Sequence, residues 1–390
     1  MSVRVKFVLL ANYFYGRLMG VINFEIDSRT GRARLTKVAT IYAAMMNILC
    51  FGLFALLIKS RIWDSFLGRL NEFHNYVFIT VMTLRISCVL VTMLNRWWQR
   101  KQIIQLLNQF RRLVLEQPKV IRMWRRGVIS KWITGTINEL TQMFIPLYAL
   151  RATLTASMAL GLSTMCVLIA LLNIIISQYY FAVLNVHGHY VLCNEELRLI
   201  LRETQSLELD YRKGVSDLRS CALADRIDSL ALRQSALQTL LHKMTRIFGI
   251  QILCMGTVIY ISFIASLYSA FLAIKYKMIN TNFFTWENQL FFLGVCSYIA
   301  DVHISYSITY YLEDQYEKMR QLVMQYSSFA PTVDRRLTTA FESFQLQLVR
   351  DPQKLSVLGL YNMNRKIAIS MLSSMVTYSL ILIQYDIKNY

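Results

Sequence analysis

The sequence predicts an all-α, polytopic membrane protein with seven transmembrane helices. Three observations carry this prediction. Of the 390 residues, 55% are apolar. Only 17% are charged, and this balance is typical of chains that meet lipid. Seven stretches have the roughly 20 residues that an α-helix needs to cross the hydrocarbon core of a bilayer.

Each span is justified by its own residues, taken in chain order. The first and last spans have no charge, whereas the second contains Arg85, the third Glu139 and the sixth Asp301. The uncharged stretch from Ala152 to Leu184 is too long for one upright helix, so the boundary between the third and fourth spans is placed near Arg151. The expected spans are Val38–Ile58, Tyr76–Leu94, Trp132–Leu150, Ser157–Leu184, Ile247–Ala273, Asn288–Tyr311 and Ile367–Tyr385.

The basic residues predict which side of the membrane each segment faces. With the N-terminus in the cytosol, 34 of the 42 Lys and Arg residues lie in cytosolic segments, as the positive-inside rule requires. This expectation makes 1–37 a cytoplasmic N-terminal segment, 38–311 a block of six spans with a cytosolic helical loop at 185–246, and 312–366 a second cytosolic helical loop. Residues 367–390 form the seventh span and a short extracellular tail. Topology explains the net charge of +19, so no nucleic-acid partner is expected.

The cytosolic loops carry helical patterns of their own. Residues Arg226–Phe248 repeat apolar side chains at three-, four- and seven-residue steps, which predicts an amphipathic helix continuous with the fifth span. Helices are also expected at Glu195–Leu209 and Val333–Val349, and Tyr311–Tyr326 is expected to extend the sixth span. Their apolar faces either pack between subunits or pack within one subunit.

The last span has a polar stripe. Ser370, Ser373, Thr377 and Gln384 return to one side of a helix, and Leu380 and Ile381 interrupt them. A water-filled path with a hydrophobic constriction has this pattern, because such constrictions close pores by dewetting. The alternative is that these polar side chains bond to neighbouring helices.

The end of this span resembles a known family. Thr377-Tyr378, five mostly apolar residues and then Gln384 match the C-terminal TYhhhhhQF signature of insect gustatory receptors, with Tyr385 in place of the usual phenylalanine. The position close to the C-terminus, the seven spans and the basic cytosolic face are also similar to that family.

The resemblance implies a ligand-gated, nonselective cation channel in the plasma membrane of gustatory neurons. It implies a homo- or heterotetramer with related receptors, in which the seventh span of each subunit lines a central pore. Carried onto this chain, the resemblance places Thr377, Tyr378, Gln384 and Tyr385 in the pore or its support. Leu380 and Ile381 join these pore candidates because they interrupt the polar stripe. Gln384 is the expected gate residue, and Tyr385 adds a hydroxyl near the pore mouth.

The resemblance also implies a pocket for a small-molecule taste ligand within the helical bundle of each subunit, open to the outside. Aromatic walls with few hydroxyls favour an aversive, bitter compound slightly over a sugar. At each position the alternative role is helix packing. The candidates in the outer halves of the spans are Tyr76, Thr80, Tyr148, Tyr268, Phe271, Phe291, Phe292 and Tyr298.

Three charged residues, Arg85, Glu139 and Asp301, lie at comparable depths within their spans. An ion pair of Arg85 with Glu139 or Asp301 would reduce the cost of inserting both partners. Contact with a ligand and a place on an ion pathway are the two alternatives.

Other function classes fit the sequence less well. His187 and His189 lack the spacing and the companion ligands of a metal site, so no metal or other cofactor is expected. A G-protein-coupled receptor would need an outside N-terminus, and the chain has neither DRY after its third span nor NPxxY in its seventh. A multipass membrane enzyme would have only Glu139, Asp301 and His303 as intramembrane acid–base groups, so the chain is not expected to be an enzyme.

Overall fold

The computed structural model describes residues 3–27, 29–59, 72–150, 155–207, 213–275, 286–329, 335–353 and 355–389. The expected boundary near Arg151 lies outside these residues. The all-α class is confirmed, because seven long helices follow the seven expected spans in order. They are α2 (Lys37–Lys59), α4 (Glu72–Trp98), α6 (Val120–Leu150), α7 (Ala156–Leu207), α8 (Lys213–Lys275), α9 (Trp286–Phe329) and α11 (Arg365–Asn389).

The seven helices differ in how apolar they are. Within the described residues, α2, α4, α7, α8 and α11 are long and apolar enough to cross a membrane. Helices α6 and α9 correspond to the third and sixth expected spans and contain Glu139 and Asp301. Both pack against α7 and against each other, so their polar side chains can find partners inside the bundle.

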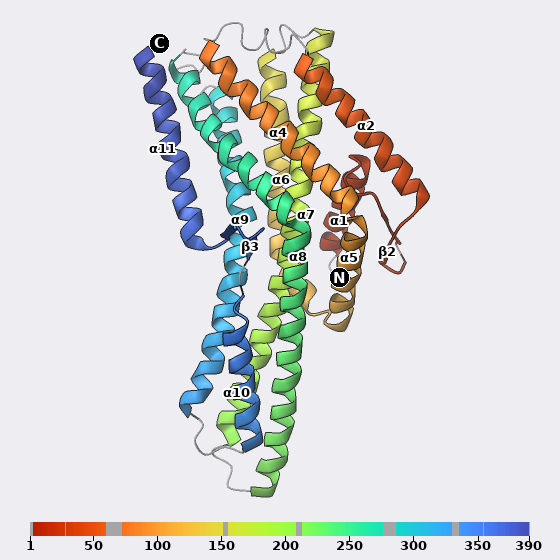
Figure 1. Ribbon diagram of the computed structural model, residues 1–390, viewed down its shortest axis with the longest axis vertical. Coiled ribbons are helices and arrows are strands. Elements are labelled where there is room, and N and C mark those ends of the chain that lie inside the picture. Colours follow the sequence, from red (N-terminus) through yellow and green to blue (C-terminus); the bar gives the residue numbers. More distant parts are fainter. Residues whose placement is uncertain are drawn as a thin grey trace.

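Helices α7, α8 and α9 continue far beyond the apolar part of the bundle (Figure 1). Helix α8 alone has 63 residues, which corresponds to about 95 Å at 1.5 Å per residue. The shorter helix α10 (Arg335–Arg350) lies along α8 and α9 and buries one apolar face, made of Leu337, Ala340, Phe341, Phe344 and Leu348. The amphipathic face expected in Arg226–Phe248 is likewise buried. These faces therefore pack within one subunit and not between subunits, which were the two alternatives that the sequence left open.

The N-terminal part contains elements that the expected spans did not include. Helix α1 (Val3–Leu18) packs against α6 and α7. Strands β1 (Glu25–Ile26) and β2 (Ala33–Arg34) form an antiparallel hairpin against α5 (Arg100–Glu116). The Asn108 side chain accepts from the Ala33 N–H at 3.0 Å and donates to its carbonyl at 3.1 Å, which fixes the hairpin to α5.

A second hairpin joins α10 to α11. Its strands are β3 (Ser356–Val357) and β4 (Tyr361–Asn362), paired antiparallel. Leu358 and Gly359 in its turn have φ of 51° and 76°, the left-handed region that few side chains tolerate. The Leu358 side chain lies over Gly249 of α8, where an added Cβ would come within 2.6 Å of it. The hairpin therefore rests on α8 immediately before α11 begins.

Candidate functional site

Helix α11 stands at the side of the bundle with most of its surface uncovered (Figure 1). Its buried residues are Met375, Ser379 and Asp386. At 3.6 residues per turn, this buried face is on the opposite side of the helix from Ser370, Ser373, Thr377 and Gln384. All four residues of this polar stripe are exposed. The stripe therefore faces away from the subunit to which α11 belongs.

The apolar residues beside the stripe are exposed as well. Leu380 and Ile381 are about half exposed, at 51% and 50%, and lie on its two flanks. Tyr378 and Tyr385 are exposed to a similar extent. The Thr377 hydroxyl donates to the Ser373 carbonyl at 3.0 Å, so this stripe residue is satisfied within its own helix.

The buried face of α11 is fastened to α8. The Lys275 ammonium donates to the fully buried Asp386 carboxylate at 2.7 Å, and the Tyr268 hydroxyl donates to the same carboxylate at 3.4 Å. About three turns away, the Tyr260 hydroxyl lies 3.0 Å from the Ser374 hydroxyl. These two contacts, Lys275–Asp386 and Tyr260–Ser374, join α11 to α8. Neither the helical periodicity nor the family signature points to Asp386, although it is the one acidic residue between Lys366 and the C-terminus.

Aromatic rings lie around the Lys275–Asp386 pair. Tyr385 of α11 lies 5.0 Å, centroid to centroid, from Phe73 of α4. Phe73 makes an edge contact with Tyr268, and Tyr268 stacks on Phe271. This cluster connects the end of α11 to α4 and α8.

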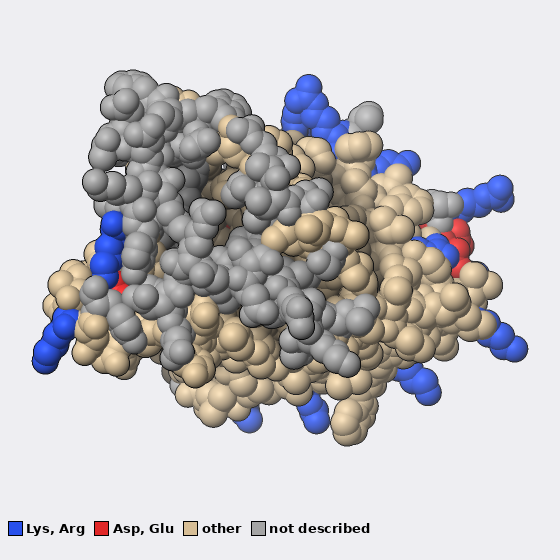
Figure 2. Space-filling model, turned by 90° about the horizontal axis from the view of Figure 1, so that it is seen from above, with Lys and Arg blue, Asp and Glu red and all other residues tan. Residues whose placement is uncertain are grey.

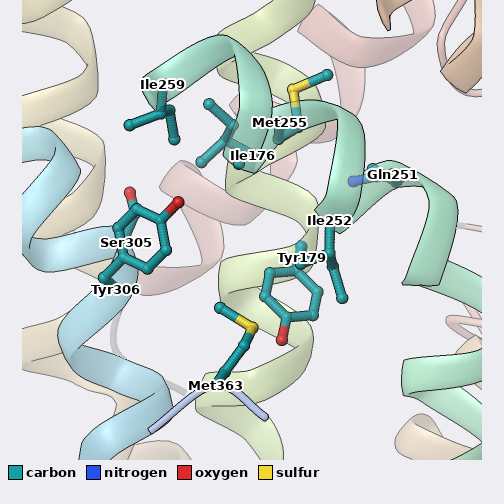
Figure 3. A pocket seen from close by; sticks show the side chains of 10 residues that line it. Ile176, Tyr179, Gln251, Ile252, Met255, Ile259, Ser305, Tyr306 and Met363 are labelled. Carbon is teal, nitrogen blue, oxygen red and sulfur yellow. The ribbon is translucent and has the colours of Figure 1, made fainter. Parts of the chain in front are cut away.

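A small apolar cavity lies near the beginning of α11. It measures about 40 Å³ and is lined by side chains of α7, α8 and α9 together with Met363, which directly follows β4. Figure 3 shows Tyr179, Ile252 and Met363 around it, with Ser305 and Tyr306 on the α9 side. The cavity is therefore close to the segment that leads into α11, but it has room for only one or two water-sized groups.

The structure does not bring all the ligand-pocket candidates together around one cavity. Tyr268 and Phe271 are adjacent, and the Tyr298 hydroxyl donates to the Ile259 carbonyl at 3.4 Å. Tyr148 stacks on Phe144 of its own helix. Tyr76, Thr80 and Phe292 are exposed, and the Phe291 side chain lies outside the described residues.

The prediction that Arg85 forms an ion pair with Glu139 or Asp301 is wrong. Asp301 instead accepts from Lys131 at 2.7 Å, in a pair whose side chains are 1% and 5% exposed. The carboxylate of Glu139 accepts from the Tyr15 hydroxyl. Arg85 donates to the Ser262 hydroxyl at 3.0 Å. Lys131 directly precedes the expected third span and faces α9. It therefore reaches Asp301, one of the two carboxylates that were expected to pair with Arg85.

Among the described residues, few charges lie on the end of the molecule at which α11 finishes. Seen from that end (Figure 2), the described surface is mainly uncharged, and Lys and Arg side chains project from its edges. In the part of the chain that the structure describes, no group of three or more His, Cys, Asp and Glu residues is placed to hold a metal ion.

Comparisons with known proteins agree with this architecture. The family model described as 7tm chemosensory receptor matches residues 9–389. Gustatory receptor 59d of Drosophila melanogaster is 34% identical, with 100% of both chains covered. Gustatory receptors 36c and 36a of the same organism are 33% and 31% identical, with 99% and 98% of both chains covered.

A solved structure shows the same fold. The insect olfactory receptor OR5 from Machilis hrabei, in complex with eugenol, superimposes with a TM-score of 0.63 at 13% sequence identity. The alignment covers 97% of this chain and 98% of the receptor. The chain is therefore a multi-pass membrane protein that belongs to the 7tm chemosensory receptor family, with insect gustatory receptors as its relatives.

Proposed function

We propose that this chemosensory receptor is a subunit of a ligand-gated, nonselective cation channel whose pore is lined by α11. The observation that carries the proposal is the position of the polar stripe. Ser370, Ser373, Thr377 and Gln384 are exposed on the side of α11 opposite to its buried face. Four such helices around an axis would present these residues to water.

The flanking residues supply a gate in this proposal. Leu380 and Ile381 are exposed between Thr377 and Gln384 along the helix, and an apolar ring at this level would dewet when the pore narrows. Gln384 would stand on the outer side of that ring. The resemblance to gustatory receptors supports a tetramer, formed by this chain alone or with related receptors.

The ligand in this proposal is a small taste compound, with a bitter compound favoured over a sugar. The Tyr268–Phe271 pair and its neighbours Phe73 and Tyr385 are aromatic, and flat apolar molecules stack on such rings. The receptor of the same fold, OR5, is in complex with eugenol, an aromatic molecule. The proposed location is the plasma membrane of gustatory neurons, with the N-terminus in the cytosol and the C-terminus outside.

Whole-cell recording tests the channel directly. The chain is expressed in a cell line and exposed to bitter compounds and sugars, with Gln384→Ala beside it and Ser379→Ala as the matched variant on the buried face of α11. We expect a fast cation current that survives G-protein blockade and whose rectification or block changes in Gln384→Ala only. A response abolished by G-protein blockade would replace the channel with a G-protein-coupled receptor.

A further inference from the structure

A cavity that the proposed pore does not use lies between α1, α6 and α7. Its volume is about 170 Å³, and its lining includes Asn12 and Tyr15 of α1, Trp132 and Glu139 of α6, and Asn173 and Phe181 of α7. A cavity of about 150 Å³ is large enough to hold benzene. On α6, Gly135 lies between Lys131 and Glu139 on the same face and leaves the space open. A molecule with one ring fits this volume.

One charge in this cavity has no counter-ion in the part of the chain that the structure describes. The Glu139 carboxylate accepts from the Tyr15 hydroxyl and, at 3.4 Å, from the Asn173 amide. Lys131 lines the same cavity, but its ammonium donates to Asp301 and Ser305, both at 2.7 Å. Two neutral donors do not balance a carboxylate in a medium of low dielectric constant. The cavity therefore favours a cation.

The walls favour an organic cation over a metal ion. Trp132 and Phe181 line the cavity, and aromatic faces attract ammonium groups. We propose that this cavity binds a small organic ammonium ion, a protonated primary amine, with Glu139 as its counter-ion and the aromatic side chains against its carbon atoms.

The ammonium has two sources. One is a free amine. The other is the amino group of an ethanolamine phospholipid, because Trp132 makes an edge contact with Phe7, which is 61% exposed on the apolar outer side of α1. Leu10, Phe14 and Leu18 continue that exposed side, so the cavity borders a surface suited to lipid.

Thermal unfolding of the full-length receptor in phosphatidylglycerol nanodiscs, which contain no ammonium groups, tests the site. We expect benzylamine to raise the melting temperature and benzyl alcohol, which has the same ring without a charge, to raise it less. Glu139→Gln should lower the affinity for benzylamine roughly tenfold or more, because a hydrogen bond to a charged group is lost. Glu195→Gln, the same exchange at an exposed position of α7, should leave the benzylamine effect unchanged.

Two further variants separate binding from folding. Tyr15→Phe removes one donor to Glu139 and should leave benzylamine binding intact or strengthen it. Gly135→Val adds side-chain volume to the cavity wall and keeps the carboxylate, and its Cβ would lie an ordinary 3.7 Å from the Asp301 carboxylate. It should abolish binding even where Glu139→Gln does not fold. Equal effects of benzylamine and benzyl alcohol, or full benzylamine affinity in Glu139→Gln or in Gly135→Val, would overturn the proposal.

Lipid composition identifies the source of the ammonium. If an ethanolamine phospholipid occupies the site, adding phosphatidylethanolamine to the nanodiscs should raise the melting temperature and reduce the effect of benzylamine. If the ligand is a free amine, the benzylamine effect should persist in that lipid. Melting temperature does not depend on ion conduction, so a negative result here leaves the channel proposal standing, and absence of current leaves this site standing.

Discussion

At the scale of single residues, the charged side chains within the helices make different kinds of contact. Asp386 is buried against Lys275 at the C-terminal end of α11. Lys131 is buried against Asp301, which also accepts from the Thr134 hydroxyl at 3.2 Å. Arg85 has a neutral hydroxyl as its partner. Removing each charge should therefore have a different cost.

The first prediction concerns Asp386. Asp386→Ala removes the buried carboxylate to which Lys275 and Tyr268 donate and should destabilise the receptor by roughly 1.5–3 kcal/mol. The double variant Lys275→Met/Asp386→Leu replaces the pair by apolar groups and should recover most of that loss. The melting temperature and the current in the absence of ligand measure the two effects. A double variant no more stable than Asp386→Ala would show that the ion pair is not what fastens α11 to α8.

The second prediction compares Lys131 with Arg85, two cations within the membrane-spanning helices. Lys131→Ala leaves the buried Asp301 carboxylate without its cation and should reduce surface expression strongly, at a cost of roughly 3–5 kcal/mol. Arg85→Ala leaves only the Ser262 hydroxyl unpaired and should cost about 1 kcal/mol. Surface biotinylation of the two variants provides the measurement. Equal loss of surface receptor would contradict the contacts assigned to them.

At the scale of elements, the long helices were predicted from the sequence, whereas helix α5 and the β3–β4 hairpin were not. The stretches Val38–Ile58 and Ile367–Tyr385 stand out because lipid demands a continuous apolar run. Helix α5 repeats apolar side chains at Ile103, Leu106 and Phe110, so a helical pattern was present there. The β3–β4 hairpin left no comparable signal, because its strands have two residues each.

The candidate site was predictable in part for the same physical reason. The polar stripe of the last span follows from helical periodicity alone. The side of α11 that meets α8 depends on contacts made by Asp386 with residues more than 100 positions away, at Lys275 and Tyr268. Periodicity places residues on faces but does not choose their partners, which is why Arg85 was assigned to the wrong partner.

The third prediction tests the packing of α10. Phe344 is 1% exposed in the apolar face that meets α8 and α9, whereas Leu346, two residues along the same helix, is 69% exposed. Phe344→Ala should destabilise the receptor by roughly 3–5 kcal/mol, and Leu346→Ala should stay within about 0.5 kcal/mol of the unaltered chain. Chemical or thermal unfolding in detergent compares them. Similar losses in both variants would mean that the Leu346 side of α10 is also covered in the assembled receptor.

For the whole molecule, the distribution of Lys and Arg predicts an orientation in the membrane with the N-terminus in the cytosol. We predict that an epitope tag at the C-terminus is stained on intact cells, and that a tag at the N-terminus is stained only after permeabilisation. Tags at both ends of the same expressed chain provide the control for surface delivery. Staining of the N-terminal tag on intact cells would reverse the topology and remove the basis for the cytosolic position of α10.

The central claim is that one side of α11 faces an ion pathway, and cysteine modification tests it most directly. Single substitutions Ser373→Cys, Thr377→Cys and Gln384→Cys lie on the polar stripe, and Met375→Cys and Ser379→Cys lie on the buried face. The unaltered chain, with its seven cysteines, gives the background. A charged thiol reagent should change the ligand-evoked cation current of the stripe variants and spare the buried-face variants. Modification that changes the current equally on both faces, or on the buried face alone, would contradict the account.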